Sequence, residues 1–221
     1  ITHTRARSDA TEAGARGATL PGITEEVFTV GLDADYEAIA AECASMLERV
    51  DGAEVIRVTS PQGTDIAFEL GDRPWNDDTG IVRDSGDFSN LPAGEVFISP
   101  ESADGTYVVD GTIRPHGRLQ AGQTVTFEVE DGFVTEVSDE AIRSDLETAA
   151  ESVGRDAYNL AELGIGTNVA VTELLGSVLL DEKAAGTVHI AVGDDAGIGG
   201  DVEAPIHMDG LLRDPTVFVD G

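Results

Sequence analysis

The central part of this 221-residue chain alternates apolar and polar residues in short runs separated by turn signals. A period of two places every second side chain on the same face of an extended strand and is not typical of a helix. Asp131-Gly132, between two of these runs, is the strongest signal for a tight hairpin turn. The pattern therefore predicts an antiparallel sheet, built from the runs EVFISP, TYVVDGTI, QTVTFEVEDG and FVTEVS between residues 95 and 138.

Two longer segments carry apolar residues at helical spacing. The first spans Tyr36 to Val50, and a strand hairpin with Pro61-Gln62-Gly63 as its turn follows it. The second helix is expected to start after Ser138, which is a suitable N-cap. These elements predict an α+β fold with a largely antiparallel, barrel-like sheet and about two long amphipathic helices.

The flanking regions set the expected domain organisation. Residues 1–33 are rich in Gly and Thr and predict an irregular lead-in, so residues 34–221 are expected to form the domain. The polar segment 71–94 is a long loop of the kind that is usually functional or disordered. In the last third, short apolar segments that end in Gly, Asn or Asp predict further strands, among them SVLLDEKAAG at 177–186.

The charge balance excludes whole classes of partner. Thirteen basic and 43 acidic residues give a net charge of −30, which repels nucleic acids and anionic membrane surfaces. The acids are scattered, and Lys183 is the single lysine beside twelve arginines, a pattern that we interpret as a surface adapted to a very salty cytosol. Cys43 is alone, as expected in a reducing compartment, and no apolar signal segment opens the chain. We therefore expect a cytoplasmic protein.

Three glutamates do not follow this pattern of solvated acids. Glu162 lies between apolar residues in LAELGIG, Glu95 opens EVFISP, and Glu182 lies in the turn LLDEK. A carboxylate in an apolar run is rarely buried without a counter-charge. Such positions point to a site rather than to surface hydration.

Histidines supply the second half of the predicted site. His189 lies inside the apolar strand TVHIAV, where a buried imidazole needs a partner. His207 and Asp209 are two residues apart, and so share one face of a strand. Two imidazoles and three or four carboxylates suffice to hold two divalent cations, which lower the pKa of a bridging water towards ~7. The HEXXH, G-x-S-x-G and paired CxxC signatures are absent, and DDAGIGGD lacks the Lys-Ser/Thr of a phosphate loop.

The segments GEVFISP, AELGIGTN, LLDEK, GTVHIAVG and IHMD, in this order, resemble the thermophilic-type metallo-aminopeptidases over nearly the whole chain. The resemblance implies a two-metal exopeptidase with Zn, Co or Mn, a peptide substrate and a homodimeric state. It also implies that an N-terminal α/β domain of the family is missing here. Glu162 would bridge the metals and Glu182 would be a catalytic base or a further ligand. The implied metal ligands are Glu95, Glu162, His189, His207 and Asp209.

Two departures from that family keep alternatives open. The spacing from Glu182 to His189 is longer than in typical members, and no tyrosine follows Tyr158 where one is expected. A sister group, the 2,5-dihydroxypyridine ring-cleaving dioxygenases, uses one Fe(II) on two histidines and an aspartate, here His189, His207 and Asp209. That group resembles this chain but carries histidine in place of Glu162, which favours the aminopeptidase. The third hypothesis is a catalytically inactive metal-binding homologue.

Overall fold

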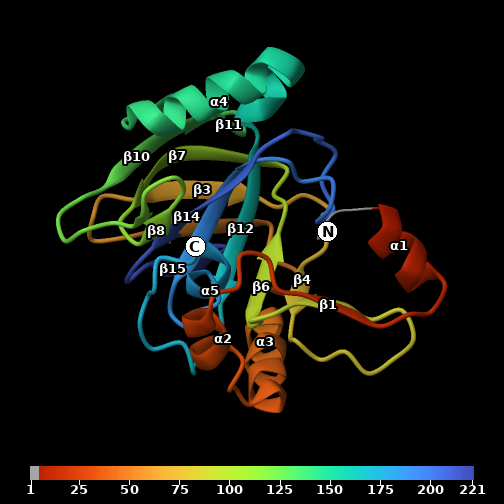
Figure 1. Cartoon of the computed structure of the whole chain (residues 1–221). Coiled ribbons are helices and arrows are strands. Elements are labelled where there is room, and N and C mark those ends of the chain that lie inside the picture. The colour runs from red at the N-terminus through yellow and green to blue at the C-terminus, as the bar shows by residue number, and fades with distance from the viewer. Residues whose placement is uncertain (1–4) are drawn as a thin grey trace.

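The computed structural model describes residues 5–221, and Figure 1 shows its arrangement. Two long helices lie at opposite ends of the molecule, with the strands between them. The helices are α1 (Arg5–Glu12), α2 (Glu25–Gly31), α3 (Tyr36–Val50), α4 (Glu140–Val153) and α5 (Val178–Asp181), and the 3-10 helix η1 (Gly154–Tyr158) follows α4.

Two antiparallel sheets form the body of the fold. The six-stranded sheet has the order β11 (Phe133–Val137), β10 (Val125–Glu130), β7 (Ser102–Val109), β3 (Asp65–Glu69), β2 (Val55–Thr59) and β15 (Thr216–Val219). The seven-stranded sheet has the order β4 (Asn76–Asp78), β6 (Glu95–Ile98), β12 (Leu160–Gly166), β13 (Val188–Gly193), β14 (His207–Leu212), β8 (Thr112–Ile113) and β9 (Gly117–Arg118). A parallel pair, β1 (Gly17–Thr19) with β5 (Phe88–Asn90), forms a separate two-stranded sheet.

The predicted fold class is confirmed, with one difference in how the sheets end. All strand pairs of the two main sheets are antiparallel. Within residues 5–221 no pairing joins the end strands β11 and β15 to β4 or β9, so the sheets stay open and form no closed barrel. The two sheets pack against one shared core instead. Apolar side chains therefore alternate inward along the strands, as they would in a barrel.

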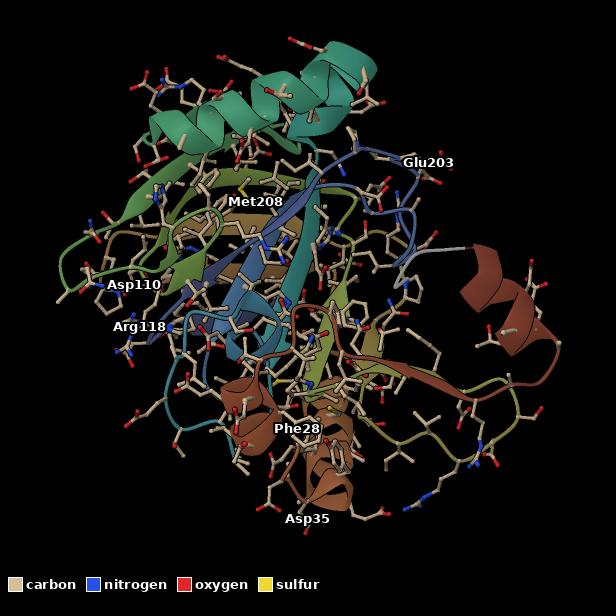
Figure 2. All side chains as sticks on the ribbon, in the orientation of Figure 1. Phe28, Asp35, Asp110, Arg118, Glu203 and Met208 are labelled. Carbon is tan, nitrogen blue, oxygen red and sulfur yellow. The ribbon has the colours of Figure 1, made fainter. Side chains whose placement is uncertain are left out.

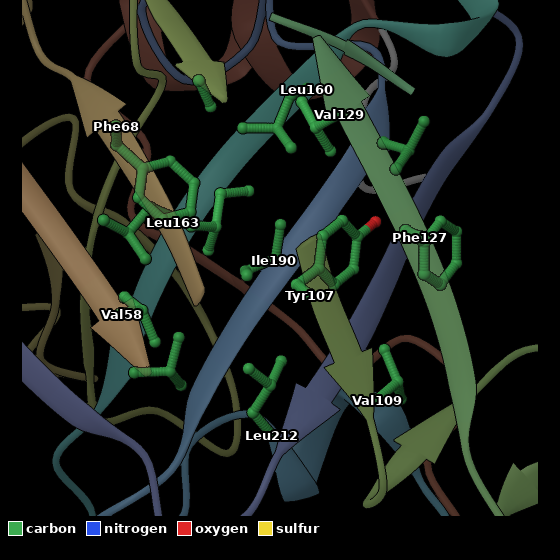
Figure 3. Packing of buried hydrophobic residues seen from close by; sticks show 14 of the residues in the cluster. Val58, Phe68, Tyr107, Val109, Phe127, Val129, Leu160, Leu163, Ile190 and Leu212 are labelled. Atoms are coloured by element: carbon green, nitrogen blue, oxygen red, sulfur yellow. The ribbon is translucent and has the colours of Figure 1, made fainter. Parts of the chain in front are cut away.

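The core lies between the two sheets (Figure 3). Phe68 of β3 and Tyr107 of β7 face Leu163 of β12 and Ile190 of β13 in one cluster of buried side chains. The rings of Tyr107 and Phe127 stack with centroids 4.5 Å apart. Each large apolar side chain buried here stabilises the fold by roughly 1.5–3 kcal/mol, so this cluster is the main source of stability.

Both long helices begin at aspartate caps. The Asp35 carboxylate accepts hydrogen bonds from two backbone N–H groups in the first turn of α3. Helix α4 is capped by Asp139 rather than by Ser138, because the Ser138 hydroxyl accepts a hydrogen bond from the Thr126 N–H in β10. Cys43 on α3 is fully buried.

The regions outside the main sheets carry more local structure than the sequence predicted. The segment expected as an irregular lead-in contains α1, β1 and α2 within its described part, while the domain boundary at residue 34 stays a prediction. The loop at 71–94 contains the short strands β4 and β5. The strand predicted in SVLLDEKAAG is wrong, because this segment forms the one-turn helix α5 and a turn. At the hairpin between β10 and β11, Asp131 and Gly132 both have positive φ, as the predicted tight turn requires.

The surface agrees with the scattered acidity of the sequence. Figure 2 shows oxygen-tipped side chains around the whole outline of the molecule, from Asp35 near α3 to Glu203 at the opposite side. None of the described helices has the length and apolar character needed to cross a membrane.

Candidate metal centre

Four neighbouring strands of the seven-stranded sheet bring the predicted site residues together. In this sheet β6, β12, β13 and β14 lie side by side. Gly166 of β12 pairs with Glu95, and Gly164 pairs with His189. Asp209 of β14 pairs with Ala191 of β13. The five predicted ligands therefore meet on adjacent strands, although Glu95 and Asp209 are 114 residues apart in the sequence.

Side chains of β12 point alternately into the core and towards the site. Leu163 and Ile165 point into the core between the sheets, so Glu162, Gly164 and Gly166 point to the other face. A methyl group on Gly164 would lie 1.9 Å from His189 Nε2, which shows that the imidazole occupies the space above this glycine. The motif AELGIG thus supplies one carboxylate and the room for its neighbour on a single face.

Glu162 is the centre of the site. Its Oε1 lies 3.3 Å from His189 Nε2, and its Oε2 lies 3.2 Å from His207 Nε2. His207 Nε2 is also 3.4 Å from Asp209 Oδ1. Two sets of potential ligand atoms result, and they share Glu162: an inner group of Glu95, Glu162 and His189, and an outer group of Glu162, His207 and Asp209.

The surroundings of His207 fix which ring nitrogen faces the site. His207 Nδ1 lies 2.7 Å from the backbone carbonyl oxygen of Asp194, which can only accept a hydrogen bond. Nδ1 is therefore the protonated nitrogen, and Nε2 is left to face Glu162 and a cation. Asp194 belongs to DDAGIGGD, so this segment acts through its backbone and not as a phosphate loop.

Lys183 is the site residue that the sequence analysis did not select. Its ammonium forms ion pairs with Glu95 and with Glu182, the latter at 2.8 Å, and the side chain is 1% exposed. The predicted catalytic Glu182 therefore lies beside the site with a cationic partner. A signal was present in the sequence, because a chain that uses arginine everywhere else has one lysine, and that lysine follows Glu182 in an apolar segment.

Burial and neighbouring charges shift the pKa values of the site residues in opposite directions. Burial raises the pKa of Glu162, but hydrogen bonds to the two imidazoles outweigh it and hold this pKa well below its usual range. Burial lowers the pKa of His189, but Glu162 and the other carboxylates outweigh it and raise this pKa to about 9. The pKa of Lys183 is raised well above its usual value, because Glu182 and Glu95 outweigh burial. Glu95 differs from Glu162, because burial outweighs the Lys183 ammonium and raises the pKa of Glu95 to about 8.

The donor set suits a divalent metal ion. It mixes imidazole nitrogen with carboxylate oxygen, which is typical of sites for Fe, Zn, Mn and Co. Within the described residues, neither buried Glu95 Oε2 nor His189 Nδ1 makes a hydrogen bond, although His189 Nε2 lies 3.4 Å from Glu95 Oε2. A buried carboxylate oxygen without a hydrogen bond carries a free-energy cost that a cation would remove. The residues present therefore fit a metal centre.

A cavity of about 600 Å³ opens next to this centre. Glu95, Glu162 and His207 line its floor. Its walls include apolar side chains from Phe97, Leu179, Ile198 and Ile206, together with the cation of Arg114. Sequence reasoning missed these wall residues, since they come from separate segments and have no common motif. The cavity has room for a small ring or a short peptide end.

Comparison with known proteins identifies the family. The sequence model of the 2,5-dihydroxypyridine 5,6-dioxygenases matches residues 2–221. The chain belongs to the 2,5-dihydroxypyridine 5,6-dioxygenase family. A curated relative, the 2,5-dihydroxypyridine 5,6-dioxygenase of Pseudomonas putida, is 25% identical over 183 residues, covering 76% of this chain and 51% of the relative. The chain thus spans about half the length of that dioxygenase.

Two solved structures share the fold. The 2,5-dihydroxypyridine dioxygenase from Pseudomonas putida KT2440 has a TM-score of 0.80 at 22% identity, covering all of this chain and 66% of the other. Wild-type AmpT from Thermus thermophilus has a TM-score of 0.62 at 23% identity, covering 95% of this chain and 58% of the other. At these identities both likenesses establish the architecture alone.

These findings reorder the sequence-based interpretations. An enzyme family is confirmed, and the family is that of the dioxygenase alternative rather than of the aminopeptidase placed first. Glu162 is present in this chain although the chain matches the dioxygenase family, so membership does not depend on a histidine at this position. The role of each predicted ligand stays a prediction, although the structure places all of them in one cluster.

Proposed function

We propose that this chain is the metal-binding catalytic part of a ring-cleaving dioxygenase that acts on a dihydroxylated pyridine. The reaction would break the bond between ring carbons 5 and 6 and place one atom of dioxygen on each carbon. The match to the family over residues 2–221 carries this proposal. The site geometry supports it, because the cluster lies at the floor of a cavity.

The residues that would hold a single Fe(II) are those around Glu162. His207, Asp209 and Glu162 form the outer group, and His189 reaches the other oxygen of Glu162 from β13. The outer group offers one imidazole and two carboxylates, a mixture of nitrogen and oxygen ligands that suits a non-haem Fe(II) with open positions for substrate and dioxygen. When bound, the iron would supply the activation of dioxygen and the binding of the ring hydroxyl.

The rest of the cavity would bind and orient the ring. Phe97, Ile198 and Ile206 provide apolar contact, which suits a flat aromatic substrate and excludes water from the site. Arg114 brings a guanidinium to the same cavity, where it would donate to a ring oxygen.

A second candidate is a two-metal aminopeptidase, because Glu162 is shared by two groups of potential ligands. One carboxylate between two metal positions is the arrangement that a bridged metal pair needs. The fold of AmpT, an aminopeptidase, is compatible with it. In this case the metals, when bound, would supply an activated water for hydrolysis of a peptide bond, and Glu182 would move the proton.

Oxygen uptake separates the two candidates. The chain is purified in molar salt, which its acidic surface calls for, loaded with Fe(II) without oxygen, and mixed with 2,5-dihydroxypyridine and air. We expect oxygen consumption with loss of the ring absorbance, and neither in His207→Ala. Release of p-nitroaniline from Leu-p-nitroanilide by the Zn, Co or Mn form, with no oxygen uptake by the Fe form, would contradict the dioxygenase and support the peptidase.

A further inference from the structure

The two sides of the metal centre differ in their permanent charge. On the inner side the Lys183 ammonium contacts Glu95 and Glu182, and all three side chains are at least nine-tenths buried. On the outer side Glu162 and Asp209 contact imidazoles only. The inner carboxylates thus have a fixed counter-charge, while the outer ones depend on protonated histidines or on a metal.

The ammonium and an inner metal ion would compete for the same carboxylates. Lys183 bonds Oε1 of Glu95, whose Oε2 belongs to the inner group, and it also holds Glu182. An ion bound to Glu95 Oε2 would lie next to this ammonium in a buried region, where repulsion between like charges is strong. The same carboxylates bind the lysine without any repulsion. Lysine therefore disfavours a cation in the inner group.

The choice of lysine, in a chain with twelve arginines, agrees with this role. An ammonium is a compact charge with three hydrogen-bond donors, whereas a guanidinium is a wide planar fork. Gly166 provides the space, since a methyl group there would lie 2.1 Å from the Ala184 carbonyl oxygen in the turn that carries Lys183. The sequence thus brings a small cation close to the site.

We propose that the Lys183 ammonium takes the place of a second divalent ion, so that a fold able to hold a metal pair holds one metal, beside Glu162, His207 and Asp209. This inference rests on the proposed function, because it explains how the shared Glu162 is compatible with a one-iron reaction. Lys183 is thus a residue that determines metal number.

The test is the metal content of the wild-type chain and of Lys183→Gln, measured with Mn²⁺ alone as the probe. Each protein is equilibrated with Mn²⁺, freed of loose ions, and analysed for Mn per chain. We expect one ion in the wild type and two in Lys183→Gln, with an exchange-coupled electron paramagnetic resonance signal in the variant only. The inner ion would use Glu95, Glu182, Glu162 and His189.

Two controls keep the result interpretable. Arg57→Gln removes one positive charge from an exposed ion pair with Asp65 on the other sheet and should leave one ion per chain. The double variant Lys183→Gln with Glu95→Gln removes a ligand of the inner ion and should also hold one. The midpoint temperature of thermal unfolding should rise more steeply with added Mn²⁺ in Lys183→Gln than in the wild type, because the ion replaces a missing counter-charge.

The outcomes separate this inference from the proposed function. One ion in both the wild type and Lys183→Gln overturns the role of Lys183 and leaves the one-metal centre intact. Two ions in the wild type overturn it as well and support the aminopeptidase candidate. No ion in the wild type contradicts the proposed metal centre itself. If Lys183→Gln fails to fold even with Mn²⁺ present, the cation does not replace the ammonium and the inference is also wrong.

Discussion

The two sheets treat their acidic residues in opposite ways. In the six-stranded sheet β3 and β10 alternate between buried and exposed positions, and their acids, such as Asp65 and Glu130, occupy exposed ones. In the seven-stranded sheet every residue of β12 and β13 is buried. Here Glu162 is buried, and it contacts two imidazoles.

This difference shows which acidic residues indicate a functional site in a highly acidic chain. On a half-solvated strand a carboxylate costs little and keeps the surface hydrated. On a strand covered on both faces it requires a cation, and the sequence shows this as an acid inside a continuous apolar run. The neighbours of an acid are therefore more informative than the total charge.

The largest expected effect comes from neutralising one acid in each sheet. Glu162→Gln removes the carboxylate shared by both ligand groups, so we expect loss of bound metal and of activity. It also removes one carboxylate partner from each of two buried imidazoles, which should cost about 3 kcal/mol or more in the free energy of unfolding. Metal analysis and urea unfolding check both effects.

Glu130→Gln is the matched control for this comparison. Its side chain is exposed at the end of β10, so unfolding should change by less than about 0.5 kcal/mol and metal content should not change. Equal losses in the two variants would show that the two sheets do not differ in the way described.

The next effect concerns the outer group alone. His207→Ala removes a ligand whose side chain is one-third exposed and lines the cavity. Metal affinity should fall by more than about 100-fold, the upper end of what losing a supporting contact costs. Titration with Fe(II) or Mn²⁺ under argon measures this, with circular dichroism to show that the fold persists. Unchanged affinity would remove His207 from the ligand set.

A smaller effect should follow from filling the space above β12. Gly164→Ala places a methyl group 1.9 Å from His189 Nε2, so the imidazole must move. We expect a loss of about 1–3 kcal/mol in unfolding free energy and weaker metal binding. Gly17→Ala, whose added methyl would meet Phe88 at an ordinary 3.5 Å, should change neither quantity. A Gly164→Ala protein with full metal affinity would show that His189 is not held where the structure places it.

The smallest effect lies outside both sheets, at the cap of α4. Asp139→Ala should cost about 1 kcal/mol at pH 7. Burial raises the pKa of Asp139, but hydrogen bonds from the first turn and from His116 outweigh it and lower this pKa. The Asp139 carboxylate therefore stabilises the fold above about pH 3.9, its pKa in the unfolded chain. This stabilisation is lost as the pH falls through the lower pKa of the folded state.

Urea unfolding of both proteins across the acid range tests this account of the cap. The difference between wild type and Asp139→Ala should narrow below about pH 4. A difference that stays constant down to pH 2 would mean that the charge of Asp139 has no part in it.

The elements with a clear local period could be predicted from the sequence. Helix α3 begins and ends where the spacing of apolar residues indicated, and the hairpin at Asp131-Gly132 has the expected turn. The separation of β strands into two open sheets could not be predicted, because it depends on pairings such as that of β15 with β2, more than 150 residues apart. Helix α5 was missed because one turn is too short to show a period.

The site was predictable to the extent that its residues disturb an apolar pattern. Glu95, Glu162 and His189 do so, and the structure places them within reach of one another. Arg114 and Phe97 lie in ordinary polar or apolar surroundings, so nothing in the sequence marks them as cavity residues. Lys183 was visible as a composition anomaly, but its two partners depend on tertiary structure.

The most direct test of the central claim is anomalous diffraction from crystals of the chain equilibrated with Fe(II) or Mn²⁺. The account predicts one anomalous peak within bonding distance of Glu162, His207 and Asp209, at the floor of the cavity. A crystal in which these side chains contact only one another at saturating metal, or in which the peak lies elsewhere on the acidic surface, would contradict it.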